Sequence, residues 1–432
     1  MSHRPPDRPR RRSRPPRPAA PVRPATRPLA AVAATAALAA ALTGCAAERD
    51  PGVYTIMNSG TDEPYHTWDQ EVMDRCGAEA GVRVQQISVP ADQLVPKALR
   101  MASSGSLPDV LILDGSDLPQ FAAAGGLVPL EDLGLTTDTL SPGAVAFGSY
   151  DGVYYGAARS VNSLGLFYNT ALLADAGIDP PETWAELSEA AAALTEGDRY
   201  GLAISALATE DGVYQFLPWL WSNGGDERDL TSPESVAALE YVASLIEDGS
   251  ASRSAVNWTQ ADVNDQFIAG NAAMMVNGPW QMPVLREHPD LEWAVVEIPV
   301  PEAGATPVAP IGGETYTVPV NAENTERQRT AARLIACLTT PEAQLDWSTK
   351  GSNVPVDSGA AEAYREEVPE LAPFADQVQT ARSRTQYVGT EWNTYSQAIG
   401  GALQAALTGE AAPEAAMAAA QSRIEAELEG TP

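Results

Sequence analysis

The protein has 432 residues, of which 27 are basic and 57 are acidic, and its formal net charge at pH 7 is −30. Such a large negative net charge argues against nucleic-acid binding, because that binding depends on contacts of Lys and Arg with phosphates. Nine Arg and Asp7 precede residue 45, so residues 45–432 keep 18 basic and 56 acidic side chains, a net charge of about −38. This charge favours a neutral or cationic ligand over an anionic one, or serves only to keep the surface solvated.

The N-terminus has the parts of an export signal. Residues 1–28 are rich in Arg and Pro, which predicts a disordered basic segment. Residues 29–42 are uncharged, a run as long as a signal core and shorter than the roughly 20 residues of a spanning helix. Leu42-Thr43-Gly44-Cys45 then resembles a lipobox, where a signal peptidase cuts and the cysteine is lipidated. An ordinary cleavage site beside an unrelated cysteine is the alternative.

We therefore predict a signal peptide over residues 1–44, a lipid (palmitate-type) anchor on Cys45, and a short tether over residues 45–52. The export route, Sec or twin-arginine, stays open. No second apolar run is long enough to span a bilayer, so the remaining chain is expected to form two domains at the outer face of the cell membrane. Cys76 and Cys337 either pair in a disulfide, as an oxidising compartment allows, or are separate buried residues.

Strands alternate with helices along the chain. The expected elements of the first half are a strand at 54–57, a helix at 67–80 closed by Gly81, a strand at 82–89, a helix at 92–103 and strands at 110–113 and 164–168. The run 110–113 is apolar throughout, as in a strand buried on both faces. Residues 150–154 read as a hairpin turn. This pattern predicts an α/β fold with a largely parallel sheet.

Helix signals dominate the second half. Thr183 with Glu186 forms a capping box, and Ser232 before Pro233 starts another helix. The further expected elements are a helix at 262–269 that stops at Gly270, strands at 272–277 and 315–318, and mostly helices from 325 onward. The Pro-rich stretch 298–310 suggests a passage between domains.

Catalytic patterns are scarce. Residues 45–432 contain only His66 and His288, both in polar surroundings, and no zinc, nucleophile-elbow or phosphate-loop motif. We therefore predict no enzyme activity, no metal and no cofactor. An extracellular glycosidase remains the enzymatic alternative, because 56 carboxylates offer many pairs at catalytic spacing.

Aromatic side chains gather beside Gly and Asn turns. The groups are Tyr214, Trp219 and Trp221 ahead of Asn223-Gly224-Gly225; Trp280 after Asn277-Gly278-Pro279; and Tyr387, Trp392 and Tyr395 near the end. The C–H faces of sugars stack on such rings, while hydroxyls take hydrogen bonds from carboxylates, amides and Arg. Core packing is the alternative for any one of them. The presence of several aromatic residues beside turns favours a pocket at the strand ends of an α/β fold.

A series of short segments follows in a characteristic order along the chain. The segments are Leu107-Pro108-Asp109-Val110, residues 121–130 (FAAAGGLVPL), Leu166-Phe167-Tyr168-Asn169, Ala176-Gly177-Ile178, Pro181-Glu182-Thr183-Trp184, residues 267–280 (FIAGNAAMMVNGPW) and Gly312-Gly313-Glu314. Together they resemble the extracellular solute-binding proteins of ABC importers, in the maltose- and oligosaccharide-binding branch, and the likeness covers nearly all of residues 45–432.

The resemblance implies a two-lobed periplasmic-binding-protein-like fold, with each lobe a sheet flanked by helices and the ligand in the cleft between them. It places crossings near Arg159, Gly312 and Ser358. The N-terminal lobe would comprise residues 53–159 and 313–358, and the C-terminal lobe residues 160–312 and 359–432. It also implies hinge closure on the ligand and docking on a permease.

The resemblance also suggests site residues. Tyr214 and Trp280 would stack on a sugar, with Trp392 as a third aromatic wall and Trp219 from the same aromatic group. The polar and backbone candidates are Asn58, Glu63, Asp114, Ser116, Asn162, Gly313, Glu314 and Tyr316. Apart from the resemblance, Arg384 and Tyr387 lie in a terminal segment that we expect to reach the cleft as well. Arg384 could bind a carboxylate-bearing sugar. Asn162 and Leu113-Asp114 differ from the carboxylate and Trp of maltose-binding members, which argues against maltodextrin itself.

We therefore expect a lipid-anchored, monomeric substrate-binding protein that captures a sugar or oligosaccharide and delivers it to ABC transporter permease subunits, without nucleic-acid partners. A protein of the same fold for a polyamine or osmolyte is the alternative, separable by calorimetry against both ligand classes.

Overall fold

A computed structural model describes residues 50–321, 325–368 and 371–430. The predicted signal segment 1–44 and its lipid site Cys45 lie outside these residues, as does most of the predicted tether 45–52. The chain divides after Asp50 into two units, and all the helices and strands belong to the second, Pro51–Pro432. Within the described ranges, no helix is both long and apolar enough to cross a membrane.

The first sheet has five strands in the order β2-β1-β3-β12-β6. The bounds are β1 Val53–Asn58, β2 Arg83–Ser88, β3 Val110–Asp114, β6 Gly156–Ala158 and β12 Glu314–Thr317. β1 runs parallel to β2 and β3, whereas β12 is antiparallel to both β3 and β6. The sheet is therefore completed by a strand that follows β3 by 200 residues.

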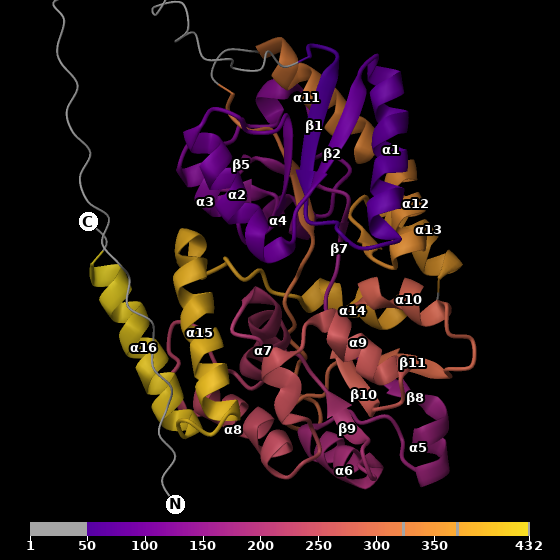
Figure 1. Cartoon of the computed structure of the whole chain (residues 1–432), viewed down its shortest axis with the longest axis vertical. Coiled ribbons are helices and arrows are strands. Elements are labelled where there is room, and N and C mark those ends of the chain that lie inside the picture. The colour runs from indigo at the N-terminus through magenta and orange to yellow at the C-terminus, as the bar shows by residue number, and fades with distance from the viewer. Residues whose placement is uncertain (1–49, 322–324, 369–370, 431–432) are drawn as a thin grey trace, which may run out of the picture. The chain divides into compact units, whose positions relative to one another are not determined.

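Helices cover both faces of this sheet (Figure 1). Because successive side chains of a strand point to opposite faces, Ile112 packs under α1 and α11 while Leu111 and Leu113 pack against α2 and α3. This double burial confirms the prediction from the apolar run 110–113. The helices are α1 Tyr65–Ala80, α2 Ala91–Ser103, α3 Leu118–Ala123, α4 Pro142–Phe147 and α11 Thr325–Leu338.

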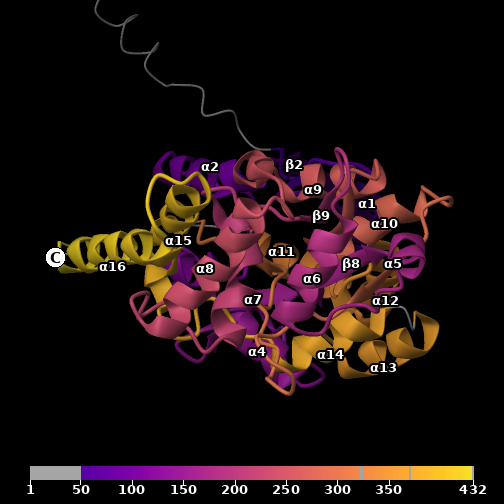
Figure 2. The ribbon, with the colours of Figure 1, turned by 90° about the horizontal axis from the view of Figure 1, so that it is seen from below.

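The second sheet has four strands in the order β11-β8-β10-β9. The bounds are β8 Gly165–Asn169, β9 Tyr200–Ala203, β10 Ala272–Asn277 and β11 Trp293–Val296. Its helices are α5 Thr170–Ala176, α6 Trp184–Leu194, α7 Glu210–Ser222, α8 Pro233–Glu247, α9 Gln260–Ile268, α10 Met282–Arg286, α14 Ala372–Thr380, α15 Trp392–Leu407 and α16 Pro413–Glu429. α15 and α16 lie side by side, as two views show (Figures 1 and 2).

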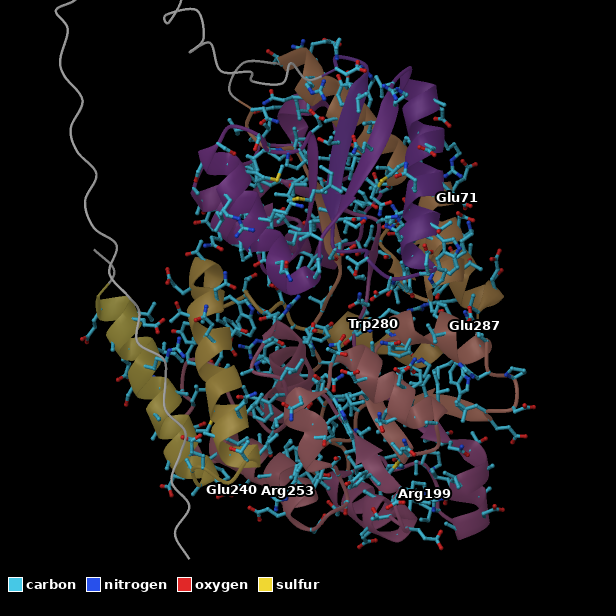
Figure 3. All side chains as sticks on the ribbon, viewed as in Figure 1. Glu71, Arg199, Glu240, Arg253, Trp280 and Glu287 are labelled. Atoms are coloured by element: carbon cyan, nitrogen blue, oxygen red, sulfur yellow. A yellow bond between two sulfur atoms is a disulfide. The ribbon has the colours of Figure 1, made fainter. Side chains whose placement is uncertain are left out.

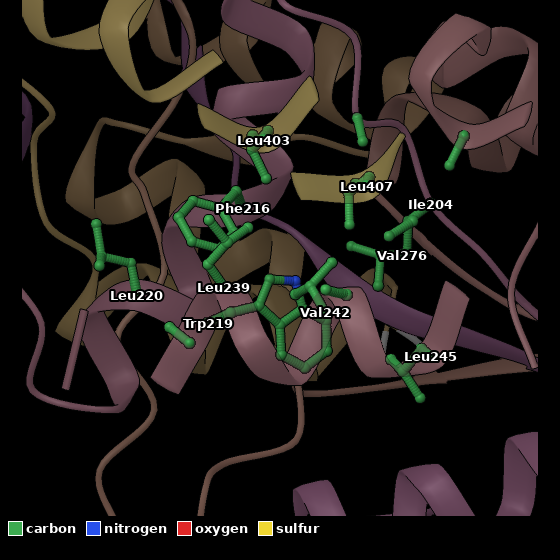
Figure 4. Close-up of a cluster of buried hydrophobic side chains, with 14 of the residues drawn as sticks. Ile204, Phe216, Trp219, Leu220, Leu239, Val242, Leu245, Val276, Leu403 and Leu407 are labelled. Atoms are coloured by element: carbon green, nitrogen blue, oxygen red, sulfur yellow. The ribbon is translucent and has the colours of Figure 1, made fainter. Parts of the chain in front are cut away.

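The largest apolar cluster lies on one face of the second sheet (Figure 4). Phe216, Trp219 and Leu220 of α7 meet Leu239 and Val242 of α8 there, together with residues of α15, α16 and the strands. The opposite face packs against α9, α10 and α14. Apolar side chains therefore cover both faces of the second sheet.

Three passages connect the two sheets. The first runs from β6 through β7 (Ser160–Val161) to β8, and the second leads from β11 back to β12, with Asn162 bridged to Gly312. In the third, β13 (Val354–Pro355), which pairs with β7, leads to α13 (Ser358–Glu367). The helix before it, α12 (Pro341–Gly351), packs Trp347 against Tyr65 and Trp68 of α1 and belongs with the first sheet. Each sheet with its helices is called a lobe below, N-terminal for the first sheet and C-terminal for the second. Both lobes are discontinuous in sequence.

Local sequence signals are confirmed. Gly81 ends α1 at φ 72°, and Thr183 and Glu186 form the capping box of α6. The hairpin of β4 (Ser149–Tyr150) and β5 (Val153–Tyr154) turns at Asp151 and Gly152, both with positive φ. The prediction of a largely parallel sheet is wrong. β12 and β8 are antiparallel to their neighbours because each enters its sheet from the other lobe.

A disulfide joins Cys76 of α1 to Cys337 of α11, with 5.7 Å between the Cα atoms. The two helices share one face of the N-terminal sheet, so the bond connects segments that are 261 residues apart within a single layer.

Candidate functional site

A cavity of about 500 Å³ lies between the lobes. The N-terminal lobe lines it with Ser59, Gly60, Thr61, Asp62, Glu63, Tyr65, Asp69, Asp114, Arg159, Glu314, Tyr316, Trp347 and Asn353. The C-terminal lobe and the passages add Ser160, Asn162, Glu210, Asp211, Tyr214, Gln260, Ala261, Asn264, Asp265, Trp280, Gln281, Val284, Gly312, Gly313 and Arg384.

The topology brings these residues together. β1 and β3 are parallel, so the loop after Asn58 and the terminal Asp114 leave the sheet at the same edge. β12 starts at that edge, which sets Glu314 opposite Asp114. Loops at the carboxyl ends of parallel strands are where α/β folds place their ligand sites. The facing lobe contributes the first turns of α7 and α9, together with the 3₁₀ turn Pro279–Gln281 that follows β10.

Arg159 organises the N-terminal wall. It is 4% exposed, its Nη2 lies 3.0 Å from Asp69 Oδ1, and its guanidinium stacks 3.4 Å from the Trp347 ring. Burial acts to lower the pKa of Arg159, but the neighbouring Tyr316 and Asp69 outweigh it and raise the pKa. Its Nε has no hydrogen-bond partner. Arg159 is therefore a permanently charged group, fixed in orientation by Asp69 and Trp347, and its Nε–H is left without an acceptor.

Arg384 links the two lobes at another part of the cavity. It is 2% exposed, its Nη2 is 2.6 Å from Asp114 Oδ1, and its Nη1 pairs with Glu210. Trp392 Nε1 and Ser396 Oγ donate to the same Glu210 carboxylate. Burial alone would lower the pKa of Arg384, while Asp114 and Glu210 raise it. With both Nη atoms engaged by carboxylates, Arg384 does not offer an anion site, contrary to the acidic-sugar hypothesis.

Aromatic rings enter the cavity from both lobes. Tyr214 and Trp280 belong to the C-terminal lobe, with ring centroids 6.4 Å apart, and Tyr65 and Trp347 face them from the N-terminal lobe, 5.6 Å apart. Tyr65 Oη donates to the Trp280 carbonyl at 2.7 Å, a hydrogen bond between the lobes. Trp280 lies in the band between the two lobes (Figure 3). Its ring covers Gly278, where a Cβ would come within 1.9 Å of the indole.

Buried acceptors and a protonatable carboxyl complete the lining. Asn264 Oδ1 and Asn353 Oδ1 are buried without a hydrogen-bond partner, in residues 2% and 6% exposed. Burial raises the pKa of Glu314, against the hydrogen bond from Ser59. Buried polar atoms normally have partners, because an unsatisfied one costs about 1–3 kcal/mol. The two Asn residues therefore carry unmet acceptors in the wall of the cavity.

The cavity brings together most of the predicted site residues. Those that line it are Glu63, Asp114, Asn162, Tyr214, Trp280, Gly313, Glu314, Tyr316 and Arg384. Asn58 and Ser116 lie just behind the lining: Asn58 is fully buried and donates to Asp69, and Ser116 donates to Asp114. Both orient a lining carboxylate instead of facing the cavity.

Three predicted aromatic residues lie elsewhere. Trp219 is 1% exposed in the core of the C-terminal lobe, because five residues along α7 from Tyr214 turn it to the opposite side of the helix. Trp392 is also 1% exposed and acts through Glu210 instead of forming a wall. Tyr387 is 49% exposed and stacks on Arg228 and Arg382 outside the cavity.

Several lining residues escaped the sequence analysis, notably Arg159, Asp69, Glu210, Tyr65 and Trp347. For Arg159 a signal existed, since it is the only charged residue between Asp151 and Asp175. A lone charge in an apolar stretch that forms buried strands needs a partner or a function. The others carry no comparable local signal.

In the described ranges, no three His, Cys, Asp or Glu side chains are grouped so that they could hold a metal ion. His288 is exposed, and His66 bonds through Nδ1 to Ser88.

Two lobes around a polar and aromatic cavity define a two-lobed binding protein. The model of the bacterial extracellular solute-binding protein family matches residues 71–380, and the chain belongs to this family. A binding protein of Brucella abortus is 27% identical over 370 residues, 81% of this chain and 86% of its own. The maltooligosaccharide ABC transporter solute-binding lipoprotein of Streptococcus pneumoniae is 26% identical over 321 residues, 69% of this chain and 71% of its own.

A solved structure supports the same fold. Maltose-bound MalE3 of T. maritima superposes with a TM-score of 0.79 at 23% identity, covering 87% of this chain and 99% of its own. The two-lobed periplasmic-binding-protein-like fold that the resemblance implied is confirmed.

Proposed function

We propose that this protein captures a sugar or oligosaccharide in the cavity between its lobes and delivers it to the permease of an ABC transporter. The observation that carries the proposal is the set of aromatic rings that enter one polar cavity from both lobes, Tyr65 and Trp347 opposite Tyr214 and Trp280. The relative from Streptococcus pneumoniae is named for maltooligosaccharides, and the superposed T. maritima structure holds maltose, which supports the ligand class.

The lining suits a polyhydroxylated ligand. Rings on both walls can cover the two C–H faces of a pyranose, at about 0.5–1.5 kcal/mol for each well-placed aromatic contact. Sugar hydroxyls can donate to the unpartnered Asn264 and Asn353 oxygens and accept from Arg159 Nε. A ligand that satisfies buried atoms removes an existing cost, so these three contacts favour the bound state.

Ligand capture would act by stabilising a closed arrangement of the lobes. Hydrogen bonds already join the lobes at Tyr65–Trp280, at Arg286 Nη1–Ser352 Oγ (3.0 Å) and at Asn393 Nδ2–Gln120 Oε1 (3.0 Å). A sugar that contacts both walls would bind the closed form more tightly than an open one and shift the population toward it. The closed form would be the one that a permease recognises.

The proposal includes a lipid anchor on Cys45. The two acyl chains of a diacylglyceryl group hold a protein stably at a bilayer, whereas one chain binds only marginally. The protein would then work as a monomer at the outer face of the membrane, within reach of its permease, and without catalytic activity.

A thermal-shift screen against sugars, oligosaccharides, polyamines and osmolytes tests the ligand class, because a ligand of the native state raises the Tm. We expect at least one sugar to raise Tm, and calorimetry to give its Kd. A shift with polyamines or osmolytes alone would overturn the sugar proposal. Release of reducing sugar from a bound oligosaccharide would instead identify a glycosidase.

A further inference from the structure

The cavity has a large excess of negative charge. Eight carboxylates line it, Asp62, Glu63, Asp69, Asp114, Glu210, Asp211, Asp265 and Glu314, against two guanidinium groups and no lysine or histidine among the described lining residues. A concave surface of one charge sign focuses the field and raises the local concentration of counter-ions. The excess is therefore a property of the cavity itself, in addition to the acidic surface of the whole chain.

The two cavity arginines do not remove this excess. Arg159 is committed to Asp69, and Arg384 is committed to Asp114 and Glu210. Among the residues that the structure describes, Asp62, Glu63 and Asp265 have no ion-pair partner. All three are exposed at the mouth of the cavity, Asp62 and Glu63 on the N-terminal lobe and Asp265 on the C-terminal lobe. Carboxylates of both lobes thus flank the opening.

A second, independent observation points to a ligand that donates hydrogen bonds. Asn264 and Asn353 are both more than nine-tenths buried, both line the cavity, and each leaves an Oδ1 without a donor. Asn264 is next to Asp265 in α9, so an unmet acceptor and an unpaired carboxylate occupy the same turn of helix. An ammonium group has three N–H donors for acceptors of the first kind and a positive charge that carboxylates of the second kind attract.

We propose that the solute carries a protonated amine, so that this protein binds an amine-bearing sugar in preference to its neutral counterpart. The inference rests on the proposed function and narrows its ligand class. The aromatic walls distinguish an amino sugar from a linear polyamine, because Trp280 and Tyr214 offer ring faces that match the C–H face of a pyranose. The carboxylates at the mouth attract the ligand, and the Asn oxygens and the rings hold it.

Pairs of sugars that differ only by an amine in place of a hydroxyl test the inference. Suitable pairs are glucosamine with glucose, galactosamine with galactose, and the β-1,4-linked glucosamine trimer with cellotriose, with spermidine added separately. We expect the amine member of a pair to bind about tenfold more tightly, and its Kd to rise with salt as surface charge is screened. The Kd of a neutral sugar should change little with salt.

Variants assign the effect to the mouth of the cavity. Asp265→Asn combined with Glu63→Gln should reduce the preference for the amine and its salt dependence, because both side chains are exposed and their loss leaves the core intact. Glu240→Gln is the matched control. Glu240 is an exposed residue of α8, far from Trp280 in the same view (Figure 3), and its loss should change neither quantity.

The outcomes separate the two proposals. Equal or tighter binding of the neutral members overturns the amine inference and leaves the sugar-binding function standing. Binding of spermidine without any sugar overturns both. If no member of the pairs binds, the amine inference is overturned. If the double variant keeps the full preference for the amine, Asp265 and Glu63 are not the source of that preference.

Discussion

Arg384 of the C-terminal lobe donates to Asp114 at the end of β3 in the N-terminal lobe, 2.6 Å away, although 270 residues separate them in sequence. The guanidinium also pairs with Glu210 of its own lobe. One side chain thus holds two carboxylates of like charge across the cavity and draws the lobes together.

Arg384→Gln should loosen this connection. Asp114 and Glu210 would face one another without a cation, but their side chains are 39% and 37% exposed, so we expect a cost of about 1–2 kcal/mol instead of the larger penalty of a fully buried pair. Small-angle scattering should show a larger radius of gyration for the unliganded variant, and ligand affinity should fall. Arg228→Gln removes an exposed pair with Asp226 outside the cavity and serves as control. An unchanged radius would contradict the role assigned to Arg384.

Trp280→Ala should weaken ligand binding by more than about 1 kcal/mol, since it removes a ring that faces the cavity. Calorimetry with the ligand found by the thermal-shift screen measures the change. Tyr387→Ala is the control, because this 49%-exposed ring lies outside the cavity and its loss should leave Kd unchanged. Equal affinities of wild type and Trp280→Ala would assign Trp280 to packing alone.

Gly278→Ala should act on the same ring indirectly. The new Cβ would lie 1.9 Å from the Trp280 indole, so the ring must move away from its place over the backbone. We expect weaker binding with little loss of Tm. Gly401→Ala in α15, where a Cβ meets nothing within 4 Å, should instead keep the affinity and raise stability by about 0.5–1 kcal/mol. Full affinity in Gly278→Ala would show that the position of the ring is not needed.

Trp219→Ala should reduce the stability of the protein and leave its ligand affinity unchanged, the reverse of what we expect for Trp280→Ala. The indole is 1% exposed and packs against Trp184 and Tyr241, so its loss leaves a large cavity in the core and costs about 3–5 kcal/mol of unfolding free energy. Denaturant unfolding measures this cost. Below the lowered Tm, Kd should stay near the wild-type value. A specific loss of affinity without loss of stability would restore Trp219 to the binding site.

Asp117 predicts a pH dependence of stability. Burial, followed by the charges of Asp114 and Glu210, raises the pKa of Asp117 from 3.8 to about 7, with Arg384 opposing. The native state therefore keeps a proton that the unfolded chain releases, and the contribution to stability, complete below about pH 3.8, is lost as pH rises through about 7. Asp117→Asn stays neutral at every pH. The Tm of Asp117→Asn minus the Tm of wild type should therefore increase as the pH rises from 5 to 8. A Tm difference that stays the same across this range would refute the raised pKa.

Elements with a signal inside one short segment were predictable. The capping box of Thr183, the glycine that ends α1 and the turn at Asp151 and Gly152 each depend on contacts within four residues. The direction of the strands was not predictable from the sequence. Whether β12 joins β3 parallel or antiparallel depends on the path of the long chain segment between them. The two-lobed architecture was accessible only through the resemblance.

The same distinction between local and long-range signals applies to the residues of the candidate site. Tyr214, Trp280 and Asp114 stand beside turns or strand ends, where loops carry ligand contacts, and they line the cavity. Trp219 and Trp392 have similar neighbours in sequence but lie on helix faces that turn inward. Tyr65 and Trp347 belong to distant helices, and only the folded chain brings them to face one another.

The antiparallel insertion of β12 determines when the protein can fold. β3 and β6 remain without their shared neighbour until residues 314–317 have been synthesised, and the core of the C-terminal lobe waits for α15 and α16 at the end of the chain. Long sequence separations between contacting strands slow folding, because a long loop must close before any contact rewards it. The N-terminal lobe therefore cannot be completed before β12 and α11 have been made, and the C-terminal lobe cannot be completed before α16 at the end of the chain.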